Sequence, residues 1–506
     1  MVLNSKEISD EVKKLNQIGI ALSGETNLKK LLELIVKETR AFTKADAGSL
    51  YLVEDDKLHF EVMQNDTIDK RIDIETEFKP YQLPLTKDSI AGYVAITKEL
   101  INIEDAYNII NKEYKFNKDF DNRTGYKGKS MLVVPMKDNE NKIIGVLQLI
   151  NSLDENGVIV PFDKSYNELV SSLASQAAVA VKNAKLLGEL KALFGSLIEY
   201  STSAIDARSP HTAGHSKRVA SYAKKMAKAI NLKKDGPLAE VTFSPEEIEE
   251  LNYAAWLHDI GKIGVKEYIL DKEYKLSLER LDVIRERFRF IKKCYEVKML
   301  KEMHMSSSDA SSEKAFDEIA GKYTAYCIEL DELFAIIDDA NSVSYLSDGI
   351  LKKLDEIMVK KFFDGEGNEV HLLTSSEFKS LSVKHGNLTH EEYDHIQSHV
   401  IHTKNILSKI PFAGNLKNVP FYAASHHEML DGSGYSDGLH GDELPVQSRI
   451  LAIADVYDAL TAFDRPYKKA LGNEEAIDIL KQEARNGKLD PHIVDIFIYD
   501  TLYHVD

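Results

Sequence analysis

The segment from about Asp163 to Ile205 constrains the fold more than any other part of the sequence. It contains no proline and only two glycines. These are the residue types that interrupt helices most strongly, so the segment predicts one long helix. We therefore expect a chain of at least two domains in series, with residues 1–162 as the first domain, 163–200 as a connecting helix and 201–506 as the second domain.

Apolar residues recur along this predicted helix at the seven-residue spacing of a coiled coil. Gln176 and Asn183 interrupt the seam with polar side chains. Parallel dimerisation is the favoured interpretation, and a helix packed against its own domain is the alternative. The repeat consists of Leu173, Ala180, Leu187 and Phe194, with Leu190 and Leu197 on the intervening seam.

The first domain mixes helical and strand patterns. Residues 28–43 form an amphipathic helical pattern, and three stretches have the alternation and the flanking turns of antiparallel strands. These stretches are residues 47–63, 129–138 and 142–151. Antiparallel strands with helices on one side predict an α+β sensory module.

The second domain is expected to be helical, because glycine and proline are confined to short loops. Residues 275–385 within it are highly charged and lower in apolar content, so we interpret them as a helical insertion. The insertion contains a weak internal repeat, in which residues 275–293 resemble residues 387–405 at an offset of 112. In that alignment Arg287 takes the place of His399.

Composition excludes several classes of function. The net charge of -18 argues against binding of nucleic-acid polymers, which usually requires a broad basic face. Cys294 and Cys327 are the only cysteines, so neither a disulfide framework nor a thiolate metal site is expected. The polar N-terminus and the lack of any apolar run near 18 residues predict a cytoplasmic protein without a membrane span.

The stretch "AAWLHDIGKIG", residues 254–264, is the sharpest local signal for chemistry. His258 and Asp259 at the end of an apolar helix offer an imidazole and a carboxylate, and a carboxylate can bridge two metal ions. Lys262 follows one turn later and can hold a phosphate oxygen. A chance pair that includes an ordinary core histidine is the alternative.

Further candidate ligands favour a metal site. Asp455 lies within an apolar helical pattern, where an unpaired carboxylate is costly. The other candidates are Asp206, His215, His399, His426 and His427. Oxygen and nitrogen donors without thiolates suit iron, manganese or zinc, and this number of ligands indicates two or three ions that support hydrolysis. We expect the remaining nearby histidines to be ordinary surface or core residues: His211, His385, His390, His395 and His402.

The order of these motifs, with "HDIGKIG", "HHEMLDGSGYS" and "RILAIADVYDALTAFDRPYKKA", resembles the HD-GYP family of HD-domain metal-dependent phosphohydrolases. The resemblance covers residues 200–274 and 386–495. It implies hydrolysis of cyclic di-GMP to pGpG, and in many members onward to GMP, with two or three divalent ions, iron or manganese; the sequence leaves the end product open between pGpG and GMP. The implied ligands are His215, His258, Asp259, His399, His426, His427 and Asp455, with Asp259 as the bridging carboxylate. Asp206 stands where members that hold a third ion have glutamate.

The same resemblance implies a set of residues that contact the substrate. Lys262 matches a lysine that contacts the scissile phosphate, and Tyr435, Arg465 and Lys468 match contacts to bases and phosphates, with Arg449 a weaker candidate.

The chain departs from the family pattern at three places. Ser436 replaces the proline of the motif that names the family, and Ser209 replaces an aspartate. Loss of the proline removes a restraint on φ, so we expect a looser loop that remains functional. The third departure is the insertion. From the sequence it could form a lid, a dimer contact or a surface for a partner, and the sequence does not distinguish these roles.

The first half resembles a GAF domain over about residues 15–185, through "AGSLYLVED", "FNKDFDNRTGYKGKSMLVVPM" and "KIIGVLQLIN". Within it, Asn151 and Phe162 fit the motif of the cyclic-nucleotide-binding branch. Ser152, Tyr166 and Asn167 replace the charged members of that motif. Binding of cyclic AMP or cyclic GMP is one hypothesis, and a dimerising scaffold is the alternative.

Together these observations predict a cytoplasmic homodimer, paired through the GAF domain and the signalling helix, in which a GAF ligand regulates an HD-GYP cyclic di-GMP phosphodiesterase. Two rival hypotheses stay open at this stage. One is a cyclic-dinucleotide receptor without turnover, and the other is a phosphodiesterase for 3′,3′-cGAMP.

Overall fold

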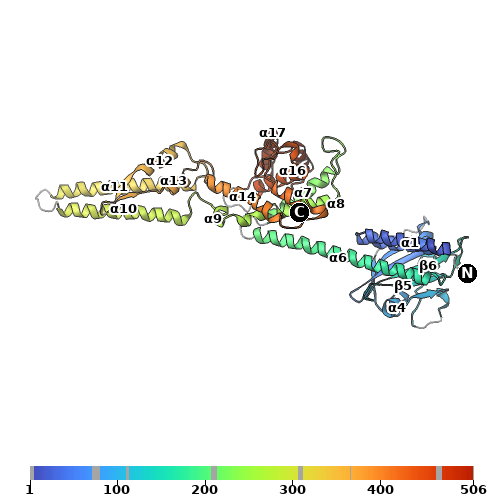
Figure 1. Ribbon diagram of the computed structural model, residues 1–506. Helices are drawn as coiled ribbons and strands as arrows, with labels where there is room; N and C mark the ends of the chain where they lie inside the picture. The colour runs from blue at the N-terminus through green and yellow to red at the C-terminus, as the bar shows by residue number, and fades with distance from the viewer. Residues whose placement is uncertain are drawn as a thin grey trace. The chain divides into compact units, whose positions relative to one another are not determined.

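The computed structural model describes residues 5–70, 80–109, 113–206, 214–305, 312–364, 366–462 and 470–504. The chain divides into two compact units, Met1–Phe194 and Gly195–Asp506. A strand-rich unit precedes a mostly helical one, which confirms the predicted multidomain class (Figure 1). None of the helices in the described residues has both the length and the apolar character needed to cross a membrane.

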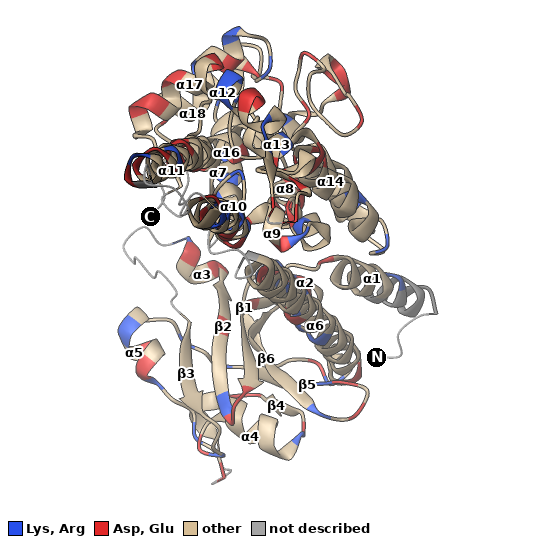
Figure 2. Cartoon of the chain, turned by 90° about the vertical axis from the view of Figure 1, so that its left-hand side faces the viewer, with Lys and Arg blue, Asp and Glu red and all other residues tan. Residues whose placement is uncertain are grey.

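The first unit is built on one antiparallel sheet with the order β3-β2-β1-β6-β5-β4 (Figure 2). The short strand β7 pairs with the C-terminal end of β6, at Ser152 and Leu153. The strands predicted from the sequence are β1, β2, β5 and β6. The bounds are β1 Ala45–Glu54, β2 Lys57–Asn65, β3 Tyr81–Pro84, β4 Ile101–Ile103, β5 Met131–Lys137, β6 Ile143–Leu153 and β7 Ile159–Val160.

Alternation along the strands sends successive side chains to opposite faces of this sheet. Leu50 and Leu52 of β1 join the core beneath α1, α2 and α6, whereas Tyr51 joins the core beneath α4. Asn27 caps α2 by accepting a hydrogen bond from the backbone N–H of Lys30. The helices of this unit are α1 Ser5–Gly24, α2 Leu28–Thr43, α3 Asp66–Asp69, α4 Ile90–Thr97, η1 Ala106–Asn108 and α5 Asp119–Thr124.

The predicted connecting helix is α6, Tyr166–Asp206. Its seam differs from the predicted one, because Leu173 and Ala180 are buried in the core of the first unit. Leu190 and Leu197 of the predicted seam are exposed, and they belong to an apolar row whose spacing alternates between four and three residues when Asn183 is included. This row consists of Val179, Leu186, Leu190, Leu193, Leu197 and Tyr200, each 40–75% exposed.

The helices of the second unit form a core in which α7, α8, α16, α17 and α18 bury their apolar faces against one another. Ser244 and Glu247 form a capping box at the start of α8, which fixes where this helix begins. The helices are α7 His215–Ile230, α8 Pro245–Leu257, η2 Ile260–Gly264, α9 Glu267–Leu270, α14 His390–Leu407, η3 Gly414–Leu416, α15 Val419–Ala424, η4 Gly441–Glu443, α16 Val446–Thr461, α17 Asn473–Arg485 and α18 Pro491–Tyr499.

Residues between α9 and α14 form a subdomain with a hydrophobic core of their own. Its elements are α10 Leu278–Met305, α11 Ser312–Ser342, α12 Asp348–Val359, β8 Lys361–Phe363, β9 Glu369–His371 and α13 Ser375–Leu381. The β8–β9 hairpin was not expected in an all-helical region. Its turn depends on Asp364, whose side chain accepts hydrogen bonds from the backbone of Glu366 and Asn368.

The internal repeat corresponds to two helices, α10 and α14. Arg287, at the position that matches His399, pairs with the buried Glu377 at 2.8 Å. The first copy of the repeat therefore serves the core of the insertion.

Candidate metal centre

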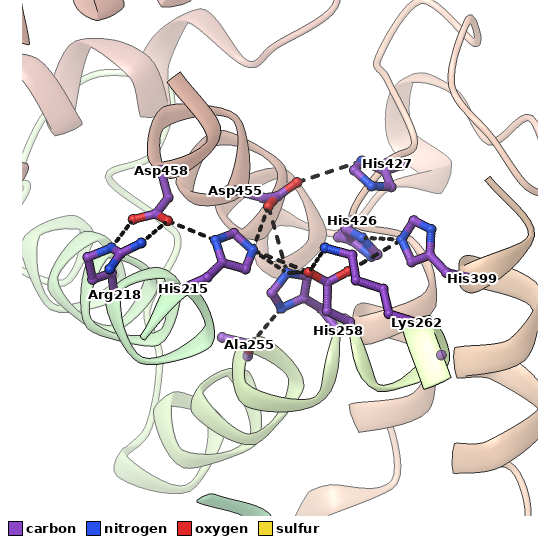
Figure 3. A network of polar contacts seen from close by, with 12 residues as sticks. His215, Arg218, Ala255, His258, Lys262, His399, His426, His427, Asp455 and Asp458 are labelled. Atoms are coloured by element: carbon purple, nitrogen blue, oxygen red, sulfur yellow. Dashed lines mark hydrogen bonds and ion pairs between the residues drawn. The ribbon is translucent and has the colours of Figure 1, made fainter. Parts of the chain in front are cut away.

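Five segments of the second unit bring histidines and aspartates to one buried place (Figure 3). His215 is the first residue of α7, and His258 with Asp259 follows the end of α8. His399 lies in α14, His426 and His427 follow α15, and Asp455 lies in α16. His427 is partly buried, and the other residues of the set are at most 8% exposed.

Gly261 is the reason that α14 can approach the segment that carries His258 and Asp259. A Cβ atom at this position would lie 2.0 Å from the backbone oxygen of His399 and 2.4 Å from the backbone nitrogen of Thr403. Thr403 completes the contact, because its hydroxyl accepts from the Gly261 N–H and donates to the His258 carbonyl. The glycine of "HDIGKIG" therefore positions His399 next to Asp259.

The ligand atoms fall into two groups. The first cluster consists of His215, His258 and Asp259, and the second cluster consists of His399, His426 and His427. Within each cluster the three donor atoms lie within 4.8 Å of one another. The Nε2 atoms of His215 and His258 are 3.1 Å apart, and those of His399 and His426 are 3.4 Å apart. Imidazole nitrogen atoms that lie this close and face one another can bind the same cation.

Two carboxylates connect the clusters, each through both of its oxygens. Asp259 Oδ2 lies 3.3 Å from His215 Nε2 and 3.2 Å from His258 Nε2, and its Oδ1 lies 3.4 Å from His399 Nε2. Asp455 Oδ1 lies 3.2 Å from His215 Nε2, and its Oδ2 lies 3.7 Å from His427 Nδ1. Asp259 is therefore oriented as a ligand that could bridge two ions. Asp455 has the same orientation, with one oxygen near each cluster.

Three histidines are oriented in the same way by the backbone. The Nδ1 atoms of His258, His399 and His426 each lie 2.7 Å from the carbonyl oxygen three residues earlier. A hydrogen bond there keeps the proton on Nδ1 and directs the Nε2 lone pair toward the ligand cluster. Of the two adjacent histidines, His426 reaches the site in this way, whereas His427 turns its Nδ1 atom toward Asp455.

His215 is oriented by a carboxylate instead of a carbonyl. Its Nδ1 lies 2.8 Å from Asp458 Oδ2, and Arg218 Nε donates to Asp458 Oδ1 at 2.7 Å. Asp458 and Arg218 were missed from the sequence. The signal was there, since Asp458 is three residues after Asp455 on the same helix, a spacing that places both carboxylates on one face.

The first cluster has a strong negative field. The pKa of His258 rises to about 9, because the attraction of Asp259 and Asp455 outweighs the lowering effect of burial. The pKa of His215 lies well above its usual value; burial lowers it, but Asp259, Asp455 and Asp458 outweigh burial.

The second cluster has the opposite electrostatics. Burial lowers the pKa of His427 to about 4 and that of His426 well below its usual value. Burial also lowers the pKa of His399. These imidazoles are therefore neutral at neutral pH, which is the form that binds a metal ion.

Lys262 lies beside the bridging carboxylate. Its Nζ atom is 2.5 Å from Asp259 Oδ2, and its side chain is 23% exposed. The pKa of Asp259 lies well below its usual range, because Lys262 and His258 outweigh the raising effect of burial. Lys262 therefore provides a positive charge at the edge of the cluster.

The loop that contains Tyr435 folds back over the second cluster. The rings of Tyr435 and His427 lie 4.8 Å apart, and the Tyr435 N–H donates to the His427 carbonyl. Gly434 makes this fold possible, since a Cβ atom there would lie 2.5 Å from the backbone of Glu428. The Tyr435–Ser436 peptide bond is cis.

Glu428 is a further residue that sequence reasoning missed. Its buried carboxylate accepts hydrogen bonds from the backbone N–H groups of Asp437, Gly438 and Leu439, at 2.7, 3.2 and 3.1 Å. It thereby fixes the far side of the Tyr435 loop.

Not every predicted site residue joins the cluster. Arg449 uses its guanidinium to hold the Leu444 and Gly441 carbonyls and Asp490. Arg465, Lys468 and the side chain of Asp206 lie outside the described residues. Their assignments stay predictions.

In the first unit, the two residues that fit the nucleotide-binding motif have structural contacts. The buried Asn151 side chain accepts from the backbone of Lys129 and donates to the Tyr126 hydroxyl and the Lys127 carbonyl. Phe162 is buried in the core. The contacts of Asn151 and Phe162 within the first unit therefore explain why these residues are present, without a bound cyclic nucleotide.

Models of two known domain families match the chain. A model of the GAF domain matches residues 27–181, and two models of the HD domain match residues 212–342 and 376–493. The solved GAF domain of a phosphoenolpyruvate-protein phosphotransferase from Coxiella burnetii is 21% identical, with a TM-score of 0.28; the alignment covers 35% of this chain and 96% of that chain.

Among the relatives are proteins named as cyclic-dinucleotide phosphodiesterases. A probable cyclic di-GMP phosphodiesterase of Vibrio cholerae is 37% identical over 132 residues, covering 25% of this chain and 30% of the relative. The 3′3′-cGAMP-specific phosphodiesterase 3 of the same species is 38% identical over 109 residues, covering 21% and 22%. The cyclic di-GMP phosphodiesterase response regulator RpfG of Xanthomonas campestris is 48% identical over 77 residues, covering 15% and 20%.

The alignments thus span less than a third of the length of each of these relatives. The two matched HD models contain every residue of the two histidine clusters, together with Asp259 and Asp455. The chain thus matches models of a GAF domain in its first unit and of an HD domain in its second.

Proposed function

We propose that this protein is a metal-dependent phosphodiesterase that hydrolyses cyclic di-GMP to pGpG, and onward to GMP. One observation carries the proposal: the two oxygens of Asp259 face different histidine clusters, with His215 and His258 on one side and His399 on the other. A carboxylate in this orientation can hold two metal ions close together, as a two-metal hydrolase does.

The donors fit divalent iron or manganese. They are imidazoles and carboxylates, and the two cysteines of the chain lie elsewhere, on α10 and α11. His215 and His258 with Asp259 would hold one ion, and the second cluster with Asp259 would hold another; a third ion would require Asp206. When bound, the ions supply Lewis-acid activation of water and neutralise charge that develops on the phosphate.

The protein residues have separate tasks in this proposal. Asp458 holds His215 in the tautomer that directs Nε2 into the site. Lys262 can reach a phosphate oxygen from the edge of the cluster and stabilise its charge. Tyr435, whose pKa is raised by burial, keeps a neutral ring next to His427, where a base can stack on it.

The decisive experiment uses the full chain loaded anaerobically with Fe(II), and separately with Mn(II). We expect pGpG or GMP from cyclic di-GMP, identified by mass. Lys262→Met should lower turnover sharply, whereas Lys266→Met, an exposed lysine four residues later, should not. Binding of cyclic di-GMP without either product under both metals would favour a receptor over an enzyme.

A second substrate, 3′,3′-cGAMP, deserves a parallel assay for a specific reason. Three relatives that carry the name 3′3′-cGAMP-specific phosphodiesterase are 38–39% identical over 109–122 residues, close to the identity with the cyclic di-GMP relative. The ratio of kcat/KM for the two dinucleotides distinguishes the candidates. A ratio above ten in favour of 3′,3′-cGAMP would replace the substrate in our proposal.

We also propose a cytoplasmic homodimer in which the α6 helices pair in parallel. The exposed apolar row from Val179 to Tyr200 has the alternating four-and-three spacing of a coiled coil. Leu186→Asn combined with Leu193→Asn should convert a dimer to monomers in sedimentation analysis. Lys185→Asn combined with Lys191→Asn, on other faces of the helix, is the control and should stay dimeric.

The domain division follows the same proposal: a GAF sensory domain over residues 1–162, a signalling helix over 163–200 and the hydrolase over 201–506 with an insertion at about 275–385. A small ligand in the GAF domain would alter turnover only if it binds the two states of the dimer with different affinity. Calorimetry with cyclic AMP and cyclic GMP, followed by turnover with and without the ligand that binds, tests this part.

A further inference from the structure

A half-exposed tyrosine on α14 lies near the metal centre but belongs to neither histidine cluster. Tyr393 is 50% exposed. Among the residues that the structure describes, none forms a hydrogen bond with its hydroxyl group or an aromatic contact with its ring. Part of the ring is therefore accessible to another molecule.

The side of α14 on which Tyr393 lies follows from a contact further along the helix. Lys404 pairs with Asp437 of the Tyr435 loop, with 2.6 Å between Nζ and Oδ2. Tyr393 precedes Lys404 by eleven residues, which is about three helical turns. Tyr393 and Lys404 therefore share the side of α14 that faces the Tyr435 loop.

The electrostatics of Tyr435 also places the two tyrosines near each other. Burial raises the pKa of Tyr435, and Tyr393 raises it further, ahead of Asp455 and Asp259. Because such effects decline with distance, Tyr393 lies in the neighbourhood of Tyr435. The Tyr435 ring is itself 4.8 Å from the ring of His427. Two tyrosines, one from the loop and one from α14, thus lie beside the second cluster.

The turn of α14 that carries Tyr393 is held where the two ends of the insertion meet. The preceding residue, Glu392, lies 2.6 Å from Lys272, and these two side chains are only 20% and 10% exposed. Asn387, just before α14, donates a hydrogen bond to the Lys272 carbonyl. Lys272 precedes the insertion and Asn387 follows it, so its closed ends fix the backbone from which Tyr393 projects.

We propose that Tyr393 is a substrate-binding residue whose ring stacks on one base of the cyclic dinucleotide, while Tyr435 contacts the other base. This inference rests on the function proposed above. A ribose separates each base from its phosphates, so rings that bind the bases must lie beside the metal centre and not within it. Stacking on an aromatic ring tolerates any base. Tyr393 therefore contributes affinity for cyclic di-GMP and for 3′,3′-cGAMP alike.

Steady-state kinetics of the full chain loaded with Mn(II) test the role of Tyr393. Tyr393→Ala should raise KM for cyclic di-GMP about tenfold and leave kcat and metal content unchanged, because stacking is lost equally from the bound substrate and the transition state. Tyr393→Phe keeps the ring and should recover the affinity. Tyr499→Ala, at an exposed position of α18, is the matched control. An unchanged KM in Tyr393→Ala, or a fall in its kcat or bound metal, would contradict the inference.

Direct binding separates the role of Tyr393 from the proposed hydrolysis. The probe is a cyclic dinucleotide with 2-aminopurine in place of one guanine, whose fluorescence falls when the base stacks on an aromatic ring. Tyr393→Ala should bind this probe about tenfold more weakly and leave it brighter when bound. Equal affinity and brightness would overturn the role of Tyr393 and leave the hydrolysis standing. If the unaltered protein binds the probe but does not hydrolyse cyclic di-GMP, the phosphodiesterase proposal fails and the same comparison still decides the role of Tyr393. No binding by the unaltered protein would contradict both.

Discussion

The two histidine clusters of the metal centre have the same kind of donor but opposite electrostatics. In the first cluster carboxylates raise the pKa of His258 to about 9, and in the second cluster burial lowers the pKa of His427 to about 4. The cause is the position of the aspartates. Asp455 Oδ1 lies 3.2 Å from His215 in the first cluster, whereas its Oδ2 lies 3.7 Å from His427 in the second.

This difference teaches that two similar ligand sets do not make equivalent metal positions. An ion that enters the first cluster gains a strong negative field, but it must displace protons from imidazoles. An ion that enters the second cluster meets imidazoles that are already neutral. We therefore expect the first position to bind more tightly and to depend on pH, and the second to exchange more readily.

The largest effect is expected from Asp259→Ala, because this change removes the ligand that the clusters share. Both ions should be lost, and turnover should fall about a thousandfold or more, since Lewis-acid activation is worth several kcal/mol. Metal content by mass spectrometry and turnover of cyclic di-GMP measure the two effects. An Asp259→Ala protein that keeps both ions would show that the clusters are not bridged here.

Single histidine variants test the two clusters separately. His427→Ala should lose the ion of the second cluster and keep that of the first, and His258→Ala should do the reverse. The reason is that each histidine belongs to one cluster only. Titration with Mn(II) followed by electron paramagnetic resonance counts the bound ions. Loss of both ions in either variant would mean that the two positions bind cooperatively.

A smaller effect is expected from Asp458→Asn, which removes a charge that orients His215. The carboxylate is buried and lies 2.8 Å from His215 Nδ1. Outer-shell partners of this kind typically contribute about 10- to 100-fold to metal affinity. Affinity at the first cluster should fall by that factor, and affinity at the second should not change. Asp437→Asn, an exposed residue of the Tyr435 loop, serves as the charge-matched control.

The smallest expected effect is the pH dependence of metal affinity, and it tests the electrostatic difference between the two clusters. Below pH 9 His258 holds a proton that a metal ion must displace, so affinity at the first cluster should rise as the pH increases from 6 to 9. His427 is neutral throughout that range, so affinity at the second cluster should stay nearly constant.

Calorimetry at pH 7 in buffers of different ionisation enthalpy measures this proton release directly. The His427→Ala protein reports on the first cluster and should release about one to two protons per ion. The His258→Ala protein reports on the second cluster and should release almost none. Equal release from both proteins would contradict the assigned difference.

Much of this architecture could be predicted from local patterns. The α6 helix follows from the absence of proline, and four of the sheet strands follow from alternation and turns. His258 and Asp259 are adjacent in the chain and stand out as a motif. Where residues that are close in the sequence are also close in space, the local sequence pattern is enough to predict the structure.

The errors occur where a distant segment decides the outcome. Leu173 and Ala180 have coiled-coil spacing, but the core of the first unit buries them, and only Leu190 and Leu197 of the predicted seam belong to the exposed row. Asp458 and Arg218 are 240 residues apart, so their pairing beside His215 depends on the packing of α7 against α16, whereas the spacing from Asp455 only places Asp458 on the same helix face. The β8–β9 hairpin depends on a turn around Asp364, in a region whose charged composition predicts helix.

The sequence by itself therefore determined the residue types of the metal centre, their order and the domains that contain them, because chemistry needs particular side chains. Only the tertiary structure decided that Asp259 and Asp455 each face both clusters, and that the carboxylates lie nearer the first. The physical reason is that charge–charge interactions depend on distances across packed helices. Contacts such as Gly261 against α14 set those distances.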